Sequence, residues 1–244
     1  AENIDADIHD FNQILEIIKS QKIDIVIIGP EEPLVNGIVD FLTNKKIKVF
    51  GPDKFSSQLE GSKAFMKDLC KKNNIPTANF GIFEKLEEAV AFIKSSKTPI
   101  VVKADGLAAG KGVSICQSKK EAEIKTKEII EGKFKSSKKV VLEEYIDGEE
   151  LSYFSVVDKN TFCFFGSAQD HKRVGEGDVG PNTGGMGAYS PASLLTEQLE
   201  EKIKKKIIDP TLKAMEALGH PYRGFLYAGL MISKGEPYLI EYNI

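Results

Sequence analysis

The chain has 244 residues, of which 41% are apolar and 28% charged, and its formal net charge at pH 7 is −3. This length suits one large domain or two ordinary ones, and the slightly acidic balance is opposite to the basic face typical of nucleic-acid-binding proteins. The three cysteines lie far apart, no apolar run reaches the roughly 20 residues that cross a bilayer, and the N-terminus lacks a signal-peptide pattern, so we expect a cytoplasmic protein with reduced thiols and no membrane partner.

The first 52 residues alternate between helical and strand-like patterns. Apolar spacing over 11–18 predicts a helix, Ile23–Ile28 a strand, the segment beginning near Pro33 a second helix, and Ile47–Phe50 a second strand. This order predicts parallel strands in a three-layer α/β unit. Two strands are too few to be stable alone. We therefore expect 1–52 to be a partial domain whose preceding strands are absent from this chain.

From residue 53 the pattern becomes α+β. We expect the three strands between 140 and 167 to form an antiparallel meander, and 169–190 to be a polar, glycine-rich loop. The predicted helices are Ser56–Asn73, 84–95, Lys119–Glu131 and 197–218, the last bent at Pro210, and the predicted strands are Ile75–Phe83, the hairpin 99–116, Val140–Ile146, Leu151–Val157, Thr161–Ser167, 224–233 and 237–243.

The stretch VVKADGLAAGKGV (101–113) resembles a phosphate-binding loop but does not fit a Walker A motif. Only three residues separate Gly106 from Gly110, and Lys111 is followed by Gly112 rather than Ser or Thr. An alternating apolar run follows where a P-loop would begin a helix. The pattern therefore predicts a strand–turn–strand hairpin.

Lys103 lies at the end of the first strand of this hairpin, where its ammonium group can reach phosphate oxygens. The glycines after it leave backbone N–H groups unshielded for the same oxygens. Taken alone, the turn 106–112 is equally compatible with an ordinary hairpin.

Three further stretches carry possible binding groups. In VVLEEYIDGEELS (140–152) a strand passes into a turn at Gly148, and such a crossing can bind the edge of adenine while a later carboxylate binds ribose hydroxyls; taken alone, a solvated strand edge explains it better. In LIEYNI (239–244), Glu241 and Asn243 point the same way on a strand and suit Mg²⁺, although Leu239 on that face breaks a simple polar pattern and exposed polar residues at a chain end are the simpler explanation.

The stretch SAQDHKRVGEGDVGPNTGGMGAYSP (167–191) is the most unusual. It places a carboxylate beside three potentially cationic side chains and then six glycines, which offer backbone donors to an anionic substrate. A loop of this length inside a compact domain is usually functional. We expect His171 to form hydrogen bonds rather than to act as an acid or base, because no partner for it is evident.

Together these stretches resemble the ATP-grasp superfamily, and within it the phosphoribosylamine–glycine ligase family. The resemblance covers nearly the whole chain, and 169–191 is its most specific part. The residues that carry it are GPEEPLVNGIVDFL (29–42), EGSKAFMKDL (60–69), VVKADGLAAGKGV (101–113), LEEYIDGEELS (142–152), QDHKRVGEGDVGPNTGGMGAYSP (169–191), YRGFLYAGLM (222–231) and LIEYN (239–243).

The resemblance implies a role for each candidate residue. Lys63 and Lys103 are similar to the two lysines that contact the nucleotide phosphates and are the expected catalytic residues. The expected nucleotide contacts are Lys63 and Lys103, the flap residues Gly106, Gly110, Lys111 and Gly112, the adenine hinge Glu143, Glu144 and Ile146, and the ribose-binding acid Glu150. The implied metal ligands are Glu241 and Asn243, for Mg²⁺ or Mn²⁺. The implied phosphoribosylamine-binding residues are Asp170, His171, Lys172, Pro181, Asn182, Thr183, Gly184, Gly185 and Gly187.

The resemblance also implies the reaction, in which ATP drives amide formation between glycine and phosphoribosylamine through a glycyl phosphate, as a step of purine biosynthesis. It implies an ATP-grasp domain over 53–244, with a flap-bearing subdomain at about 75–146, truncated at its C-terminal end. Fusion to or association with other purine-pathway domains is compatible with it. A third carboxylate ligand is in doubt, because Leu226-Tyr227-Ala228-Gly229 stands where many ATP-grasp enzymes carry an acid. The alternatives are an ATP-binding module without catalysis and a ligase for another carboxylate.

Overall fold

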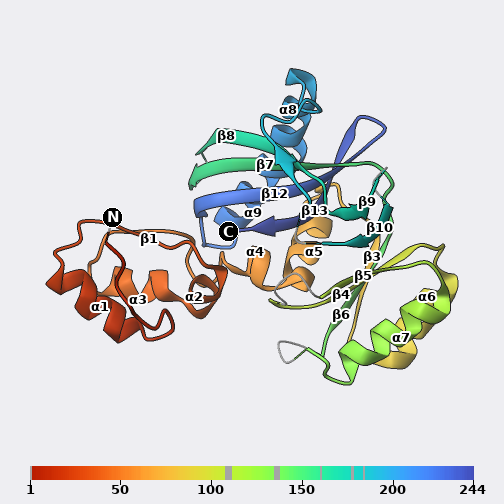
Figure 1. Ribbon diagram of the computed structural model, residues 1–244, viewed down its shortest axis with the longest axis horizontal. Helices are drawn as coiled ribbons and strands as arrows, with labels where there is room; N and C mark the ends of the chain where they lie inside the picture. Colours follow the sequence, from red (N-terminus) through yellow and green to blue (C-terminus); the bar gives the residue numbers. More distant parts are fainter. Residues whose placement is uncertain (1, 108–111, 135–137, 160, 177–178, 184) are drawn as a thin grey trace.

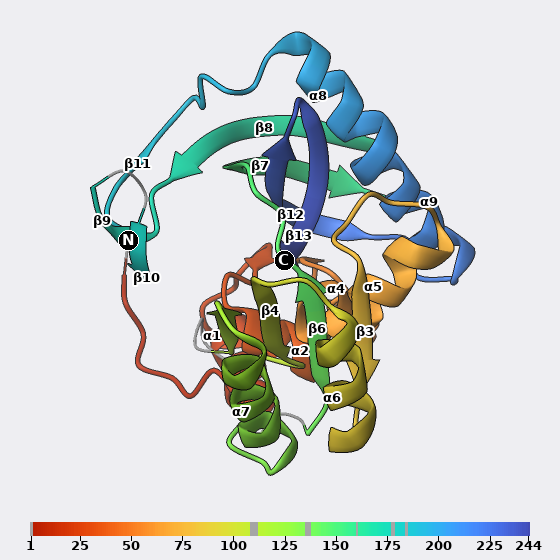
Figure 2. The same cartoon turned by 90° about the vertical axis from the view of Figure 1, so that its right-hand side faces the viewer.

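A computed structural model describes residues 2–107, 112–134, 138–159, 161–176, 179–183 and 185–244. The chain forms an N-terminal α/β unit and two larger sheets, one above the other, with helices on their outer faces (Figures 1 and 2). This arrangement confirms the predicted fold class. Among the described residues, no helix is both long and apolar enough to pass through a membrane.

The N-terminal unit has the predicted α-β-α-β order, with short strands that pair in parallel, Val26 beside Val49. The predicted second helix is interrupted, because Gly37 adopts a left-handed conformation with φ +95°. The predicted strand over 23–28 is reduced to two residues. The elements are α1 (Phe11–Ser20), β1 (Val26–Ile27), α2 (Glu31–Asn36), α3 (Ile38–Asn44) and β2 (Val49–Phe50).

The single helix predicted over 56–73 is wrong. Ser62 has an extended backbone, with φ −144° and ψ 110°, and separates α4 (Gln58–Gly61) from α5 (Lys63–Lys72). Its hydroxyl accepts a hydrogen bond from Phe65 N and donates to the Asp105 carboxylate, which also accepts from Ala64 N. These contacts hold the start of α5 against the end of the hairpin strand.

The smaller sheet has four antiparallel strands in the order β3-β6-β4-β5, and α6 and α7 pack on one face of it (Figure 1). The hairpin is confirmed, since β4 pairs with β5 and Ala104 N donates to Gly112 O at 2.8 Å. Strand β6 belongs to this sheet, so the predicted three-strand meander is wrong in its first strand. The bounds are β3 (Phe80–Phe83), α6 (Leu86–Ser95), β4 (Ile100–Ala104), β5 (Val113–Cys116), α7 (Lys119–Ile130) and β6 (Val140–Glu144).

The larger sheet has five antiparallel strands in the order β11-β8-β7-β12-β13, packed on helices α8 and α9. The segment predicted as a loop contains three short strands, and π-helical hydrogen bonding precedes Pro210, which lacks an N–H donor. The elements are β7 (Glu149–Asp158), β8 (Thr161–Asp170), β9 (Arg173–Gly175), β10 (Val179–Asn182), β11 (Ala188–Tyr189), α8 (Glu197–Ile203), η1 (Lys204–Ile208), α9 (Asp209–Ala217), β12 (Arg223–Ser233) and β13 (Glu236–Asn243).

Strand β13 contains a bulge at Ile240. Gly229 pairs with Glu241 while the next residue, Leu230, pairs with Leu239, so Ile240 is an extra residue. A bulge shifts the alternation of side chains by one position. Leu239 and Tyr242 therefore both enter the core, and Glu241 stays on the opposite face. The bulge removes the conflict that Leu239 presents in the sequence.

Gly148 lies where the chain passes from the smaller to the larger sheet. A Cβ atom there would lie 2.3 Å from the carbonyl oxygen of Ile232, so this position needs glycine for close approach of two backbones. We expect Gly148→Ala to lower the free energy of unfolding by roughly 1–3 kcal/mol, measured by urea denaturation. Gly166→Ala is the matched control, because nothing lies within 4 Å of its Cβ position. Equal stability of the two variants would contradict this account of Gly148.

Candidate active site

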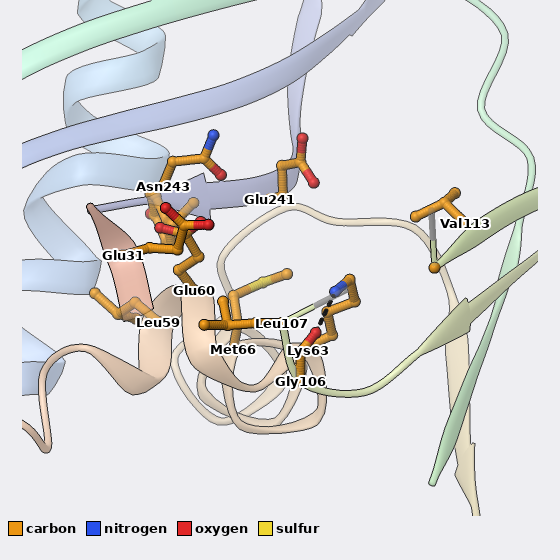
Figure 3. Close-up of a pocket in the computed structure, with 12 residues that line it drawn as sticks. Glu31, Leu59, Glu60, Lys63, Met66, Gly106, Leu107, Val113, Glu241 and Asn243 are labelled. Carbon is orange, nitrogen blue, oxygen red and sulfur yellow. Dashed lines mark hydrogen bonds between the residues drawn. The ribbon is translucent and has the colours of Figure 1, made fainter. Parts of the chain in front are cut away.

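A cavity of about 180 Å³ lies between α5, the hairpin turn and β13 (Figure 3). Lys63 enters it from the first residue of α5, and its Nζ donates to Gly106 O at 3.0 Å. Burial lowers the pKa of Lys63, the nearby Glu241 opposes this, and the Lys103 charge adds to it. The cavity therefore holds a desolvated cation that an anionic ligand would stabilise.

The opposite wall of this cavity carries side-chain oxygen atoms from β13 (Figure 3). Glu241 and Asn243 both face it, on the side of the strand away from the buried Tyr242. A carboxylate and an amide oxygen are suitable ligands for Mg²⁺, which binds few protein groups and completes its shell with phosphates and water. Among the described residues, no group of three or more His, Cys, Asp or Glu side chains has metal-binding geometry. The donor set therefore suits a cation that is shared with a phosphate ligand.

Two further carboxylates line the same end of the cavity, and the sequence did not predict them as site residues. Glu31 comes from the first turn of α2, and Glu60 from α4 accepts a hydrogen bond from Ile244 N at 2.8 Å. Burial raises the pKa of Glu60 to about 7, and the charges of Glu31 and Glu241 act in the same direction. This end of the cavity is thus a region of negative potential that favours a cationic ligand.

Lys103 is buried below this cavity in an ion pair. Its Nζ lies 2.8 Å from Glu143 Oε1, and the other carboxylate oxygen of Glu143 lies 2.8 Å from the Nζ of Lys67. All three side chains are at most 5% exposed. The carboxylate of Glu143 is therefore engaged by two lysines, and only the backbone of this residue can contribute to a nucleotide-binding hinge.

The segment between the two sheets borders a second cavity, of about 230 Å³. Glu150 lines it together with Asp170, His171 and Lys172, and Lys172 Nζ lies 3.2 Å from Glu150 Oε2. Burial alone would lower the pKa of Lys172, but Glu150, Tyr227 and Glu241 together outweigh this and the pKa is raised. The structure thus brings the predicted ribose acid and part of the predicted substrate loop to one place.

The other hinge residues lie next to this cavity rather than in its lining. Glu144 is exposed, and its Oε1 accepts a hydrogen bond from Asn79 N at 3.0 Å. Ile146 lies in the connection between β6 and β7 and is partly buried. Tyr145 does line the cavity, together with Met231 from β12.

A third, small cavity of about 30 Å³ adjoins the first two. It shares Glu150 and Lys172 with the second cavity and Glu241 with the first, and Tyr227 lies between them. The three cavities therefore adjoin one another, and we refer to them together as the groove.

The glycine-rich segment folds back on the residues that precede it. Met186 N donates to His171 O at 2.7 Å, His171 N donates to Gly187 O at 3.0 Å, and the Thr183 hydroxyl donates to Lys172 O at 2.8 Å. Gly185 approaches Asp170 so closely that a Cβ would lie 3.0 Å from its Oδ1. The segment therefore holds the 170–172 backbone in place.

The remaining predicted residues lie in β10, at the hairpin turn or outside the described residues. Pro181 and Asn182 are part of β10, which pairs with β9. Gly112 and Gly106 line the first cavity. Gly110, Lys111 and Gly184 lie outside the described residues.

Comparison with known proteins identifies the family. Residues 61–244 match the family described as phosphoribosylglycinamide synthetase, ATP-grasp (A) domain, and residues 1–60 match the N domain of the same synthetase. The chain belongs to the phosphoribosylglycinamide synthetase family.

Named relatives of this synthetase family are similar over the whole chain. Phosphoribosylamine–glycine ligase of Mesorhizobium japonicum is 51% identical over 244 residues, which are 100% of this chain and 57% of that protein. The ligase of the same name from Escherichia coli O6:H1 is 46% identical over 99% of this chain and 57% of its own length. This chain thus spans a little over half the length of these relatives.

Solved structures show the same fold. The crystal structure of phosphoribosylamine–glycine ligase from Thermotoga maritima has a TM-score of 0.79 and 40% identity, and covers 93% of this chain and 56% of its own. A biotin carboxylase from Campylobacter jejuni in a β-γ-ATP complex has a TM-score of 0.76 at 20% identity, and covers 96% of this chain and 51% of its own. The second likeness supports the fold alone.

Proposed function

We propose that the groove is the active site of an ATP-dependent carbon–nitrogen ligase in the full-length protein. In this proposal the enzyme joins glycine to 5-phosphoribosylamine and gives glycinamide ribonucleotide, ADP and phosphate. The observation that carries the proposal is the adjacency of the three cavities, which share lining residues and place Lys63 and Glu241 at one end of the groove and Glu150 and Lys172 at the other. The names of the related ligases support the choice of substrates.

The charged residues of the groove have different proposed roles according to their sign. In this proposal Lys63 and Lys103 hold the nucleotide phosphates, and Glu150 receives the ribose hydroxyls. Glu241 and Asn243 would hold Mg²⁺, which supplies charge neutralisation and Lewis acidity at the phosphates. Lys172, beside Glu150, is the cation available for the anionic phosphoribosylamine.

The proposed reaction requires the protein to position the reactants and does not require a nucleophile from the protein. A carboxylate oxygen of glycine attacks the γ-phosphorus of ATP, and ADP leaves. The amine of phosphoribosylamine then attacks the carbonyl carbon of glycyl phosphate, and phosphate departs with the carboxylate oxygen while the amine loses a proton. Fixed positive groups stabilise the charge that develops on the transferred phosphoryl group.

The release of ADP tests this proposal. We expect the full-length protein with Mg²⁺ and ATP to release ADP rapidly only when glycine and phosphoribosylamine are both present. A coupled ADP assay with each substrate omitted in turn measures this. ATP binding without such turnover would instead favour a non-catalytic module, and turnover with a different carboxylate would replace glycine as the substrate.

A further inference from the structure

Lys67 is a completely buried lysine to which the proposed chemistry gives no role. It lies on α5, its side chain is 0% exposed, and its Nζ donates to Glu143 Oε2 at 2.8 Å and to Thr77 Oγ1 at 2.6 Å. The same nitrogen lies 5.8 Å from the centre of the Phe80 ring. A buried ammonium group is costly unless it is paired, and Lys67 is paired with the carboxylate that Lys103 also contacts.

Glu143 is shared evenly between the two lysines. One of its carboxylate oxygens faces Lys103 and the other faces Lys67, each at 2.8 Å, and the side chain is 2% exposed. Burial alone would raise the pKa of Glu143, but Lys103 and Lys67 together hold it below its ordinary value. The two lysines therefore stabilise the negative charge of this carboxylate.

Lys67, Glu143 and Lys103 form a triad whose net charge depends on Lys67. Two ammonium groups and one carboxylate sum to one positive charge, whereas Lys103 and Glu143 alone would sum to zero. We propose that Lys67 is a positioning residue that offsets the charge of Glu143, so that Lys103 presents a net positive charge to the nucleotide phosphates. This inference rests on the proposed function, because it assigns the phosphates to Lys103.

The triad is also tied to the strand that carries the metal-ligand candidates. Thr77 Oγ1, which accepts from Lys67, donates to Leu239 O at 2.6 Å, and Lys103 Nζ is 3.4 Å from Ile240 O. Both carbonyls belong to the bulge that directs Glu241 into the groove. Lys67 therefore helps to fix the position of Lys103 relative to Glu241 and Asn243 on β13.

The dissociation constant of MgATP, measured by isothermal titration calorimetry on the full-length protein, tests the inference. We expect Lys67→Met to weaken binding roughly 10- to 100-fold, because the charge near the phosphates falls by one unit at low local dielectric. Lys71→Met is the matched control, since it removes the same formal charge from an exposed position on the same helix. It is expected to bind MgATP as the unaltered protein does.

A double variant separates charge from packing. Lys67→Met with Glu143→Gln restores one positive charge at Lys103, so we expect it to recover most of the lost affinity. If Lys67 served only to fill space, the double variant would bind no better than the single one, and that result would overturn the inference. Circular dichroism and thermal unfolding of each variant establish that the fold is retained. The double variant removes the carboxylate together with the ammonium group, so its affinity can be compared with that of the unaltered protein even if the single variant unfolds.

The outcomes also separate this inference from the proposed function. Failure of the unaltered full-length protein to bind MgATP would overturn both. Normal binding by the unaltered protein together with equal affinities of the Lys67→Met and Lys71→Met variants would overturn only the role of Lys67.

Discussion

Replacing Lys103 by methionine is expected to lower the ATP-dependent activity of the full-length protein at least about 100-fold while leaving its fold intact. The ammonium group of Lys103 lies at the end of β4, where the charge on a transferred phosphoryl group would be stabilised. The fold should survive because Glu143 keeps its ion pair with Lys67. Steady-state kinetics with varied ATP, together with a thermal unfolding curve, measures both parts of the expectation.

Lys97→Met is the control for this experiment. Lys97 is exposed just before the same strand, so its loss changes the net charge without touching the groove. Unchanged kinetics in the Lys103 variant would remove this residue from the active site. A large loss of stability would instead show that Lys67 alone does not compensate Glu143.

Replacing Glu241 by glutamine is expected to lower kcat at least about 100-fold at millimolar Mg²⁺ and to shift the Mg²⁺ dependence to higher concentration. The substitution keeps the size of the side chain but removes the charge that a divalent cation requires. The Mg²⁺ titration of activity at saturating ATP measures the effect.

Glu236→Gln provides the matched control on the same strand. Glu236 pairs with Lys202 and Lys206 at the surface, outside the three cavities of the groove. An unshifted Mg²⁺ dependence in the Glu241 variant would contradict its assignment as a metal ligand.

Local patterns in the sequence predict much of the fold, because many of its helices, strands and turns depend on residues that are close together in the sequence. The hairpin around 106–112 follows from alternating apolar residues on both sides of a glycine-rich turn, and the parallel pairing of β1 with β2 follows from the helical segment between them. The interruptions at Gly37 and Ser62 were not predicted, because helical periodicity continues through both. The left-handed conformation of Gly37 interrupts the first helix. The second is interrupted at Ser62, which has an extended backbone and whose hydroxyl donates a hydrogen bond to Asp105.

The residues of the candidate site also fall into some that the sequence predicts and some that it does not. The family resemblance identifies Lys63, Lys103 and Glu241 as candidate site residues. The structure brings Lys63 and Glu241 to one cavity, with Lys103 buried beside it. Lys67 and Glu60 were missed, because their roles depend on partners far away in the sequence. The bulge at Ile240 was also missed, since it depends on pairing with β12 and leaves no mark in the pattern of β13 itself.

The fate of the glycine carboxylate oxygen tests the proposed ligation most directly. Glycine labelled with ¹⁸O in its carboxylate is incubated with the full-length protein, MgATP and phosphoribosylamine, and the released phosphate is analysed by mass spectrometry. A glycyl phosphate intermediate predicts that each phosphate carries one oxygen from glycine. Product formation with unlabelled phosphate would contradict the account.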